Sequence, residues 1–197
     1  MLLIAAYFLL IGLTPRVVRK TTSVDPSGYT RGFPNVQSFS DLMHLGLLTG
    51  MVVSGRTATV LDALVTYFCC DALWHWRTFV ANPPYLAHHV LGCVQVYVVQ
   101  TRLAEHVPTI AFLTWVQETA LVPICLIDIM RMSDAVVPRA ALALRPLWYF
   151  STRAYAYGLF FCSHRGAIDP SLLALCAPMV LHNACVLRRQ VVRFVRR

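Results

Sequence analysis

Four ionisable residues lie in apolar stretches of the sequence and could take part in proton transfer: Asp71, His88, His89 and Glu118. A histidine can take up or release a proton near neutral pH, and it can also attack a carbonyl group. A carboxylate that hydrogen-bonds a histidine fixes its tautomer, as in acyl-transfer sites, and Asp71 could do this here. Glu118 is expected to pair with Arg153 or with a histidine. Asp71, His88, His89 and Glu118 are therefore candidate residues for catalysis or for contact with a ligand.

The adjacent histidines are the most unusual feature of the sequence. Neighbouring residues on a helix point about 100° apart, so both rings cannot bind one metal ion without strain, and we predict no metal site. One ring can instead face a cavity while the other packs against a second helix or hydrogen-bonds it. His88 shares a helix face with Gln95, seven residues on, which indicates an inward polar stripe. In the alternative interpretation, both are interfacial histidines at the start of a helix.

The composition predicts that these residues lie within a membrane. Of the 197 residues, 57% are apolar and 13% are Asp, Glu, Lys or Arg, whereas a soluble domain averages about 25% charged residues. A disordered chain is excluded because it needs little apolar sequence and much charge. The net charge of +8 does not indicate a nucleic-acid partner, because the arginines lie between apolar runs and at the C-terminal end. That placement fits the topology of a membrane protein.

The seven cysteines all lie in apolar stretches. No two of them form a C-x-x-C motif, and none pairs with a histidine at the spacing of a zinc site. We therefore expect them to be small buried apolar residues rather than a disulfide framework or a metal site.

Seven apolar segments can be marked, at about residues 1–14, 40–55, 58–74, 86–101, 107–130, 146–162 and 169–187. Their apolar runs are continuous and do not alternate, which favours helices over strands, although several are shorter than the about 20 residues of a straight membrane helix. The first is expected to be a retained helix, because it lacks the positive region and the clear cleavage site of a signal peptide. The predicted fold is an all-α polytopic membrane bundle of six to seven transmembrane helices around a central cavity.

The basic residues predict the orientation of this bundle. With seven crossings and the N-terminus outside, thirteen of the sixteen basic residues in loops and tail fall on one side. Cytoplasmic loops carry such an excess, so we expect a cytosolic C-terminus. The chain then divides into an N-terminal helix and cytosolic loop (1–38), a transmembrane domain (39–187) and a basic cytosolic tail (188–197). The tail is expected to lie against anionic head groups; a retention signal or nucleic-acid binding is the alternative.

Ionisable groups within hydrocarbon are costly, so each is a candidate site residue. Their estimated depths cluster in the cytosolic half of the bundle, where a cavity open to that side would keep them hydrated. Besides the four residues above, the residues predicted to line this cavity are His44, Gln95, Asp128, Arg153 and His182. We expect Arg153 to pair with Glu118 or, as a second choice, with Asp71. The apolar inner end is expected to be large enough for an acyl chain.

Three motifs resemble those of the TLC-domain family of membrane proteins. The run YFCCDALWHW, which contains Asp71, resembles the family's Y-x-x-x-D helix. LAHHVLG resembles its tandem-histidine helix, and VQETALVP looks like its E-x-S/T-x-P type of segment, with Glu118 in the place of the acid. The order and spacing of the three motifs agree with the family over residues 58–130.

The resemblance implies a helical bundle of six or more spans around a central cavity, in the endoplasmic reticulum. The family includes the ceramide synthases, which transfer a fatty acyl group from acyl-CoA to the amine of a sphingoid base, with the histidine pair and nearby acids as the catalytic set. Ceramide synthases carry an Asp-rich run before the family acid, where this chain has AFLTWVQE. The chain therefore resembles more closely the smaller TLC-domain proteins, whose roles include membrane-lipid homeostasis.

Three functions follow from these observations. In the first, the protein acts in sphingolipid or phospholipid homeostasis through its intramembrane cavity. In the second, it is an N-acyltransferase of the ceramide-synthase type, with acyl-CoA as co-substrate. In the third, it handles lipid or cargo without covalent chemistry. Membrane lipid is the expected partner in each case, and no cofactor is expected.

Overall fold

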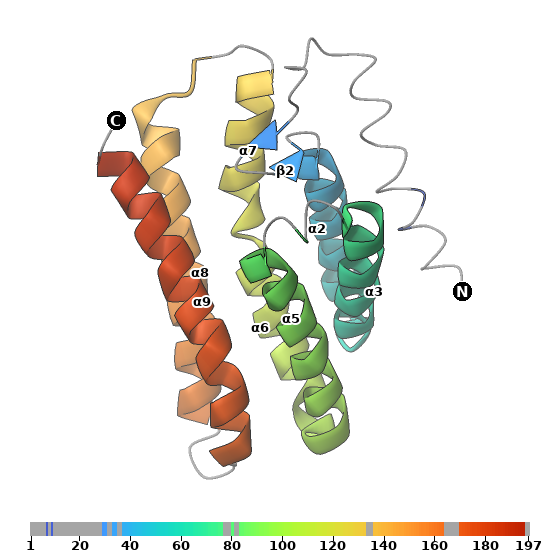
Figure 1. Ribbon diagram of the computed structural model, residues 1–197. Coiled ribbons are helices and arrows are strands. Elements are labelled where there is room, and N and C mark those ends of the chain that lie inside the picture. The colour runs from blue at the N-terminus through green and yellow to red at the C-terminus, as the bar shows by residue number, and fades with distance from the viewer. Residues whose placement is uncertain are drawn as a thin grey trace.

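The computed structural model describes Tyr7, Leu9 and residues 29–30, 33–34, 37–76, 80, 83–132, 136–163 and 170–195. These residues are predominantly helical (Figure 1), which confirms the all-α fold class. The helices are α2 (Gln37–Val53), α3 (Thr59–Trp74), α5 (Pro83–Arg102), the 3-10 turn η1 (Ala104–His106), α6 (Val107–Glu118), α7 (Leu121–Met132), α8 (Arg139–Ser163) and α9 (Pro170–Val195). Two short strands, β1 (Tyr29–Thr30) and β2 (Phe33–Pro34), pair antiparallel.

The helices run alongside one another in alternating directions (Figure 1). Together η1, α6 and α7 make one helical pass, Ala104–Arg131, so the described residues form six passes. One end of the bundle, which we name the C-terminal end, holds the start of α2, the ends of α3 and α7, and the end of α9. The α2–α3 turn lies at the opposite end, where Gly55 adopts a positive φ of 75°.

Two helices extend beyond the predicted apolar segments. α8 begins at Arg139, before the predicted start at residue 146, and α9 continues to Val195, past residue 187. Arginine is a good helix former, and its long side chain reaches polar surroundings while its stem covers apolar surface. The helices therefore continue where the apolar run stops, and the apolar pattern alone underestimates their length.

Only Tyr7 and Leu9 of the predicted first helix lie among the described residues, and both are helical. Tyr7 is buried, and its hydroxyl oxygen lies 2.7 Å from Nδ1 of His44 on α2. Tyr7 thus packs within the bundle. The rest of residues 1–14, and most of the predicted loop 15–38, lie outside the described residues.

One helix among the described residues is both long and apolar enough to cross a membrane, the 28-residue pass Ala104–Arg131. Ser38–Val53 is apolar but shorter. Arg139, Arg145 and Arg153 lower the apolar content of the longer helix α8. By length and composition alone, the structure therefore supports one of the predicted crossings.

The close contact between α3 and α5 organises the core. α3 buries eight residues, and Phe68 among them packs against α5 at Gly92. A Cβ atom added at Gly92 would lie 2.5 Å from Cε2 of Phe68, which is closer than van der Waals contact allows. Glycine at this position therefore permits the close approach of the two helices.

We expect Gly92→Ala to lower the free energy of unfolding by about 1–3 kcal/mol, the usual effect of overpacking a core. The matched control is Gly50→Ala on α2, where the added Cβ meets nothing within 4 Å. Since alanine favours helix more than glycine does, this control should be neutral or slightly stabilising. Denaturant unfolding of both purified variants measures the difference, and equal stabilities would contradict the close contact.

Candidate functional site

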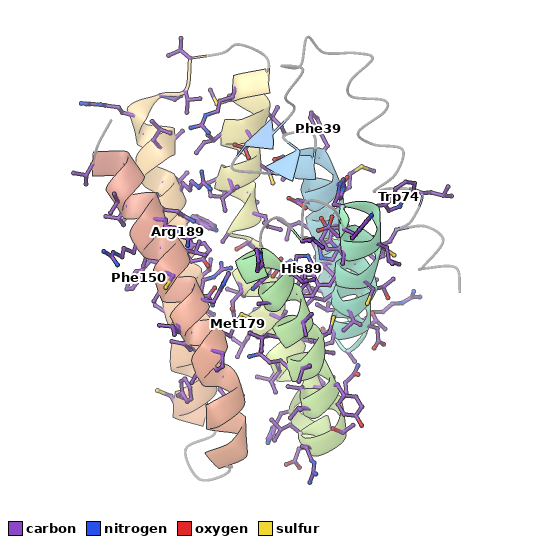
Figure 2. All side chains as sticks on the ribbon, viewed as in Figure 1. Phe39, Trp74, His89, Phe150, Met179 and Arg189 are labelled. Carbon is purple, nitrogen blue, oxygen red and sulfur yellow. The ribbon has the colours of Figure 1, made fainter. Side chains whose placement is uncertain are left out.

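A cavity of about 140 Å³ lies among α3, α5, α6, α8 and α9. Much of its wall is apolar and is formed by Leu61, Leu64, Val96, Leu113 and Met179. Figure 2 shows Met179 projecting from α9 toward the neighbouring helices. Polar side chains share the same cavity, and they include four of the residues predicted from the sequence: His88, Gln95, Glu118 and Arg153. The cavity therefore combines an apolar wall with a charged and hydrogen-bonding group of residues.

The two adjacent histidines have different surroundings. His88 lines the cavity, whereas His89 is 4% exposed and its Nε2 hydrogen-bonds Oδ2 of Asp71 at 3.2 Å. Figure 2 shows His89 within the bundle, near the start of α5. The two side chains diverge because they are neighbours on one helix. The expected contact between Asp71 and a histidine is thus found, but neither Asp71 nor His89 lines the cavity.

Asp71 is placed by the short connection between α3 and α5. It is 2% exposed, one turn before the end of α3, and its Oδ1 lies 3.8 Å from Nε2 of His75, the residue that follows α3. The carboxylate therefore lies near two histidines, one just after α3 and one on α5. Such a buried group joins the two helices at the C-terminal end of the bundle, and it supports His88 indirectly through the position of α5.

His182 on α9 stacks on His88, with ring centroids 4.9 Å apart and an angle of 20° between the ring planes. The sequence predicts that His182 lines the cavity, but it is not among the residues of the cavity wall. It lies beside His88 and holds that ring between α5 and α9. The prediction for His182 is therefore wrong in detail, although the residue does belong to the surroundings of the site.

Glu118 and Arg153 both line the cavity, from α6 and α8 respectively. The predicted ion pair is wrong: among the described residues, no acid lies within ion-pair distance of Arg153. One Nη of Arg153 instead donates to the backbone carbonyl of Gln117 at 2.7 Å, and its guanidinium lies 3.9 Å from the centre of the Tyr149 ring. These contacts hold the cation beside Glu118 without direct contact.

A chain of three hydrogen-bonding residues was not predicted. The Tyr149 hydroxyl donates to Oδ1 of Asn183 at 2.7 Å, and Nδ2 of Asn183 donates to the Tyr157 hydroxyl oxygen at 2.8 Å. Tyr157 and Asn183 line the cavity. The sequence signal for this chain is an asparagine within the apolar run of α9, because a buried amide requires hydrogen-bond partners. This chain of hydrogen bonds is not found when only ionisable residues are considered as site residues.

His44 and Asp128 do not line the cavity, which corrects the prediction for both. His44 is fully buried between α2 and α3, where its ring stacks on Tyr67 with centroids 4.0 Å apart. Asp128 on α7 accepts a hydrogen bond from Ser38 at 3.3 Å and lies 3.6 Å from Arg131. Both residues have the expected depth along their helices, but they face the contacts of α2 with α3 and α7, away from the cavity.

The volume of the cavity limits what it can hold. An apolar protein cavity of about 150 Å³ accepts benzene, so 140 Å³ corresponds to about six carbon atoms. The cavity therefore has room for only a short part of an acyl chain, less than the sequence analysis predicts. The remainder of a long chain would lie outside this cavity.

The charged residues of the cavity allow ionic and hydrogen-bonding contacts with a ligand. His88 can accept or donate a proton, Glu118 can accept hydrogen bonds, and the guanidinium of Arg153 can donate them. Among the described residues, no three His, Cys, Asp or Glu side chains are grouped so that they could hold a metal ion. The site thus offers an acid, a base and a fixed cation beside an apolar wall.

We expect Arg153→Leu to lower the free energy of unfolding by about 2–4 kcal/mol, because it removes a charged hydrogen bond and a cation–π contact. The control variant is Arg56→Leu, since Arg56 is exposed at the α2–α3 turn and should change stability by less than about 0.5 kcal/mol. Equal unfolding midpoints for the two variants would contradict these contacts.

Comparison with protein-family models, with curated proteins and with solved structures gives no match to this chain.

Proposed function

We propose that this chain is a membrane protein of the TLC type, with six to seven spans, that acts in membrane-lipid homeostasis by binding part of a lipid in its cavity. The observation that carries the proposal is the cavity itself. It joins an apolar wall, which suits a short stretch of hydrocarbon, to His88, Glu118 and Arg153, which suit a polar head group. The endoplasmic reticulum is the proposed location.

The outer surface supports a membrane environment. Large apolar side chains point outward along the helices, and Leu147, Phe150 and Leu181 are 63%, 57% and 67% exposed. Phe150 is labelled in Figure 2 on the outer side of the α8–α9 pair. Soluble monomers rarely expose apolar patches larger than a few hundred Å². Contact of this apolar surface with lipid has no free-energy cost, whereas its contact with water is unfavourable.

The arginines of the described helices support an orientation. At the C-terminal end of the bundle lie Arg131, Arg139, Arg145, Arg188 and Arg189. At the opposite end lie Arg56 and Arg102. Because basic residues accumulate on the cytosolic side, we propose that the C-terminal end faces the cytosol.

A glycosylation tag tests this orientation. A tag fused after the C-terminus should stay unmodified, and the same tag inserted at the exposed Gly55 turn should be glycosylated in the lumen. The gel mobility of each tagged protein, with and without an endoglycosidase, shows whether its tag is glycosylated. Modification of the C-terminal tag would reverse the proposed orientation.

The proposed function is tested by measuring membrane lipids in cells with and without the protein. We expect a sphingolipid or phospholipid class to change when the protein is removed, and to recover when it is restored. His88→Ala should fail to restore that class at equal expression, because His88 lines the cavity. An identical lipid composition with and without the protein would contradict the proposal.

N-acyl transfer is a second candidate, favoured by the position of His88 and Glu118 in one cavity. In this reaction the amine nitrogen of a long-chain base forms a bond to the thioester carbonyl carbon of acyl-CoA, and the carbon–sulfur bond breaks. His88 takes the proton from the amine, and the thiolate leaving group recovers it. Amide and free CoA formed by the purified protein, and abolished in His88→Ala, would favour this candidate. Bound lipid without turnover would favour lipid handling without covalent chemistry.

A further inference from the structure

The antiparallel register of α3 and α5 brings two cysteines together. Near the opposite end of the bundle, Nε2 of Gln100 on α5 donates to Oδ1 of Asp62 on α3 at 2.7 Å. Seven residues later along α3 is Cys69, and seven residues earlier along α5 is Cys93. Seven residues are close to two helical turns, so Cys69 and Cys93 face each other on the same edge of this helix pair.

The two helices are in direct contact at this level. Phe68 and Gly92, the residues directly before Cys69 and Cys93, form the tight contact in which an added Cβ would lie 2.5 Å from the ring. The Cys69 and Cys93 thiols also lie close enough to each other to interact electrostatically. A disulfide requires Cα atoms about 4.4–6.8 Å apart, so packed helices can be linked only where small residues lie between them. Gly92, which leaves room for the Phe68 ring at this level, is such a residue.

We propose that Cys69 and Cys93 form a redox site, in which a hydroperoxide converts the two thiols into a disulfide that fixes α3 against α5. Cys69 is exposed and Cys93 is half-buried, so we assign the first attack to Cys69. Its sulfur attacks a peroxide oxygen, the O–O bond breaks, and an alcohol or water leaves, which gives a sulfenic acid. The Cys93 thiol then displaces water from this group, and the S–S bond forms. The peroxide receives the two electrons.

The disulfide would act on the wall of the cavity. Phe68 and Gly92 line the cavity, and the Asp71–His89 contact joins the same two helices about one turn away. A covalent link between α3 and α5 would therefore hold this wall in the arrangement that the structure shows. The redox site itself depends on the packing of the two helices and does not rest on the proposed lipid function.

The test uses the full-length protein purified in its reduced form. The protein is treated with tert-butyl hydroperoxide, the remaining thiols are alkylated, and peptides are mapped by mass spectrometry. We expect a Cys69–Cys93 linked peptide to be the main disulfide, and dithiothreitol to reverse it. Fragment ions distinguish Cys69 from its neighbour Cys70, which is buried. A parallel sample is treated with hydrogen peroxide. The yields of linked peptide in the two samples show whether a water-soluble or a more apolar peroxide reacts better at this site.

Variants provide the controls. Cys93→Ser should abolish the linked peptide and leave Cys69 as a more highly oxidised acid, whereas Cys162→Ser, which removes another exposed cysteine, should leave the link intact. The wild-type peptide map decides the question even if a variant fails to fold. Oxidation of Cys69 without a link to Cys93, or a main disulfide that involves any other cysteine, would overturn the proposal.

Discussion

Asp71→Ala is expected to lower the free energy of unfolding by about 2–4 kcal/mol, because it removes a buried hydrogen bond and leaves the buried His89 nitrogen without this partner. Asp71 is 2% exposed and its carboxylate contacts His89 on α5 at 3.2 Å. Without it, the buried His89 ring loses its partner between α3 and α5. Denaturant unfolding in mixed micelles measures the change.

Asp62→Ala is the matched control, because Asp62 lies on the same helix and also hydrogen-bonds a residue of α5, but at the exposed edge. Exposed polar contacts contribute little, so we expect a change of less than about 1 kcal/mol. If both aspartates prove equally important, or if Asp71→Ala is as stable as the wild type, the buried contact between Asp71 and His89 is not a determinant of the fold.

His88→Ala and His89→Ala are expected to affect different properties of the protein, although the two residues are adjacent. His88 lines the cavity, so its loss should weaken lipid retention about tenfold, equivalent to about 1.4 kcal/mol, and change stability little. His89 is buried and hydrogen-bonds Asp71, so its loss should lower the free energy of unfolding by about 3 kcal/mol. Lipid retention measured beside unfolding separates the two effects.

Two outcomes would contradict this division of roles. If both variants lose the same amount of lipid and the same free energy of unfolding, the two histidines act as one group. The different contacts of His88 and His89 would then not explain their roles. If His89→Ala alone loses lipid while remaining stable, the functional ring is the one that contacts Asp71. In that case the cavity lined by His88 would not be the site.

The helices could be predicted from the sequence because continuous apolar runs and their interruptions follow directly from composition. Their ends could not, since the arginines at the start of α8 and the end of α9 continue the helices beyond the apolar runs. The Asp71–His89 contact was predictable for a different reason. A short connection makes α3 and α5 antiparallel neighbours, and residues equally far from the connection then lie at similar depth.

The remaining site residues show the limit of that reasoning. Depth along a helix does not determine which neighbour a side chain faces, so His44 and Asp128 were placed at the cavity but face other helix contacts. Arg153 was expected beside an acid because a buried charge requires compensation. The backbone carbonyl of Gln117 and the Tyr149 ring provide it instead, and neither is visible as an opposite charge in the sequence.

The most direct test of the central claim, that the cavity binds lipid, is native mass spectrometry of the full-length protein released from membranes. Ala156→Phe should fill the cavity, because Ala156 lies in its wall and is 1% exposed. Ala154→Phe is the control, since Ala154 is exposed on the same helix. We predict that the wild type and Ala154→Phe retain a bound lipid and that Ala156→Phe, still folded, does not. Equal lipid retention by all three proteins would contradict the account.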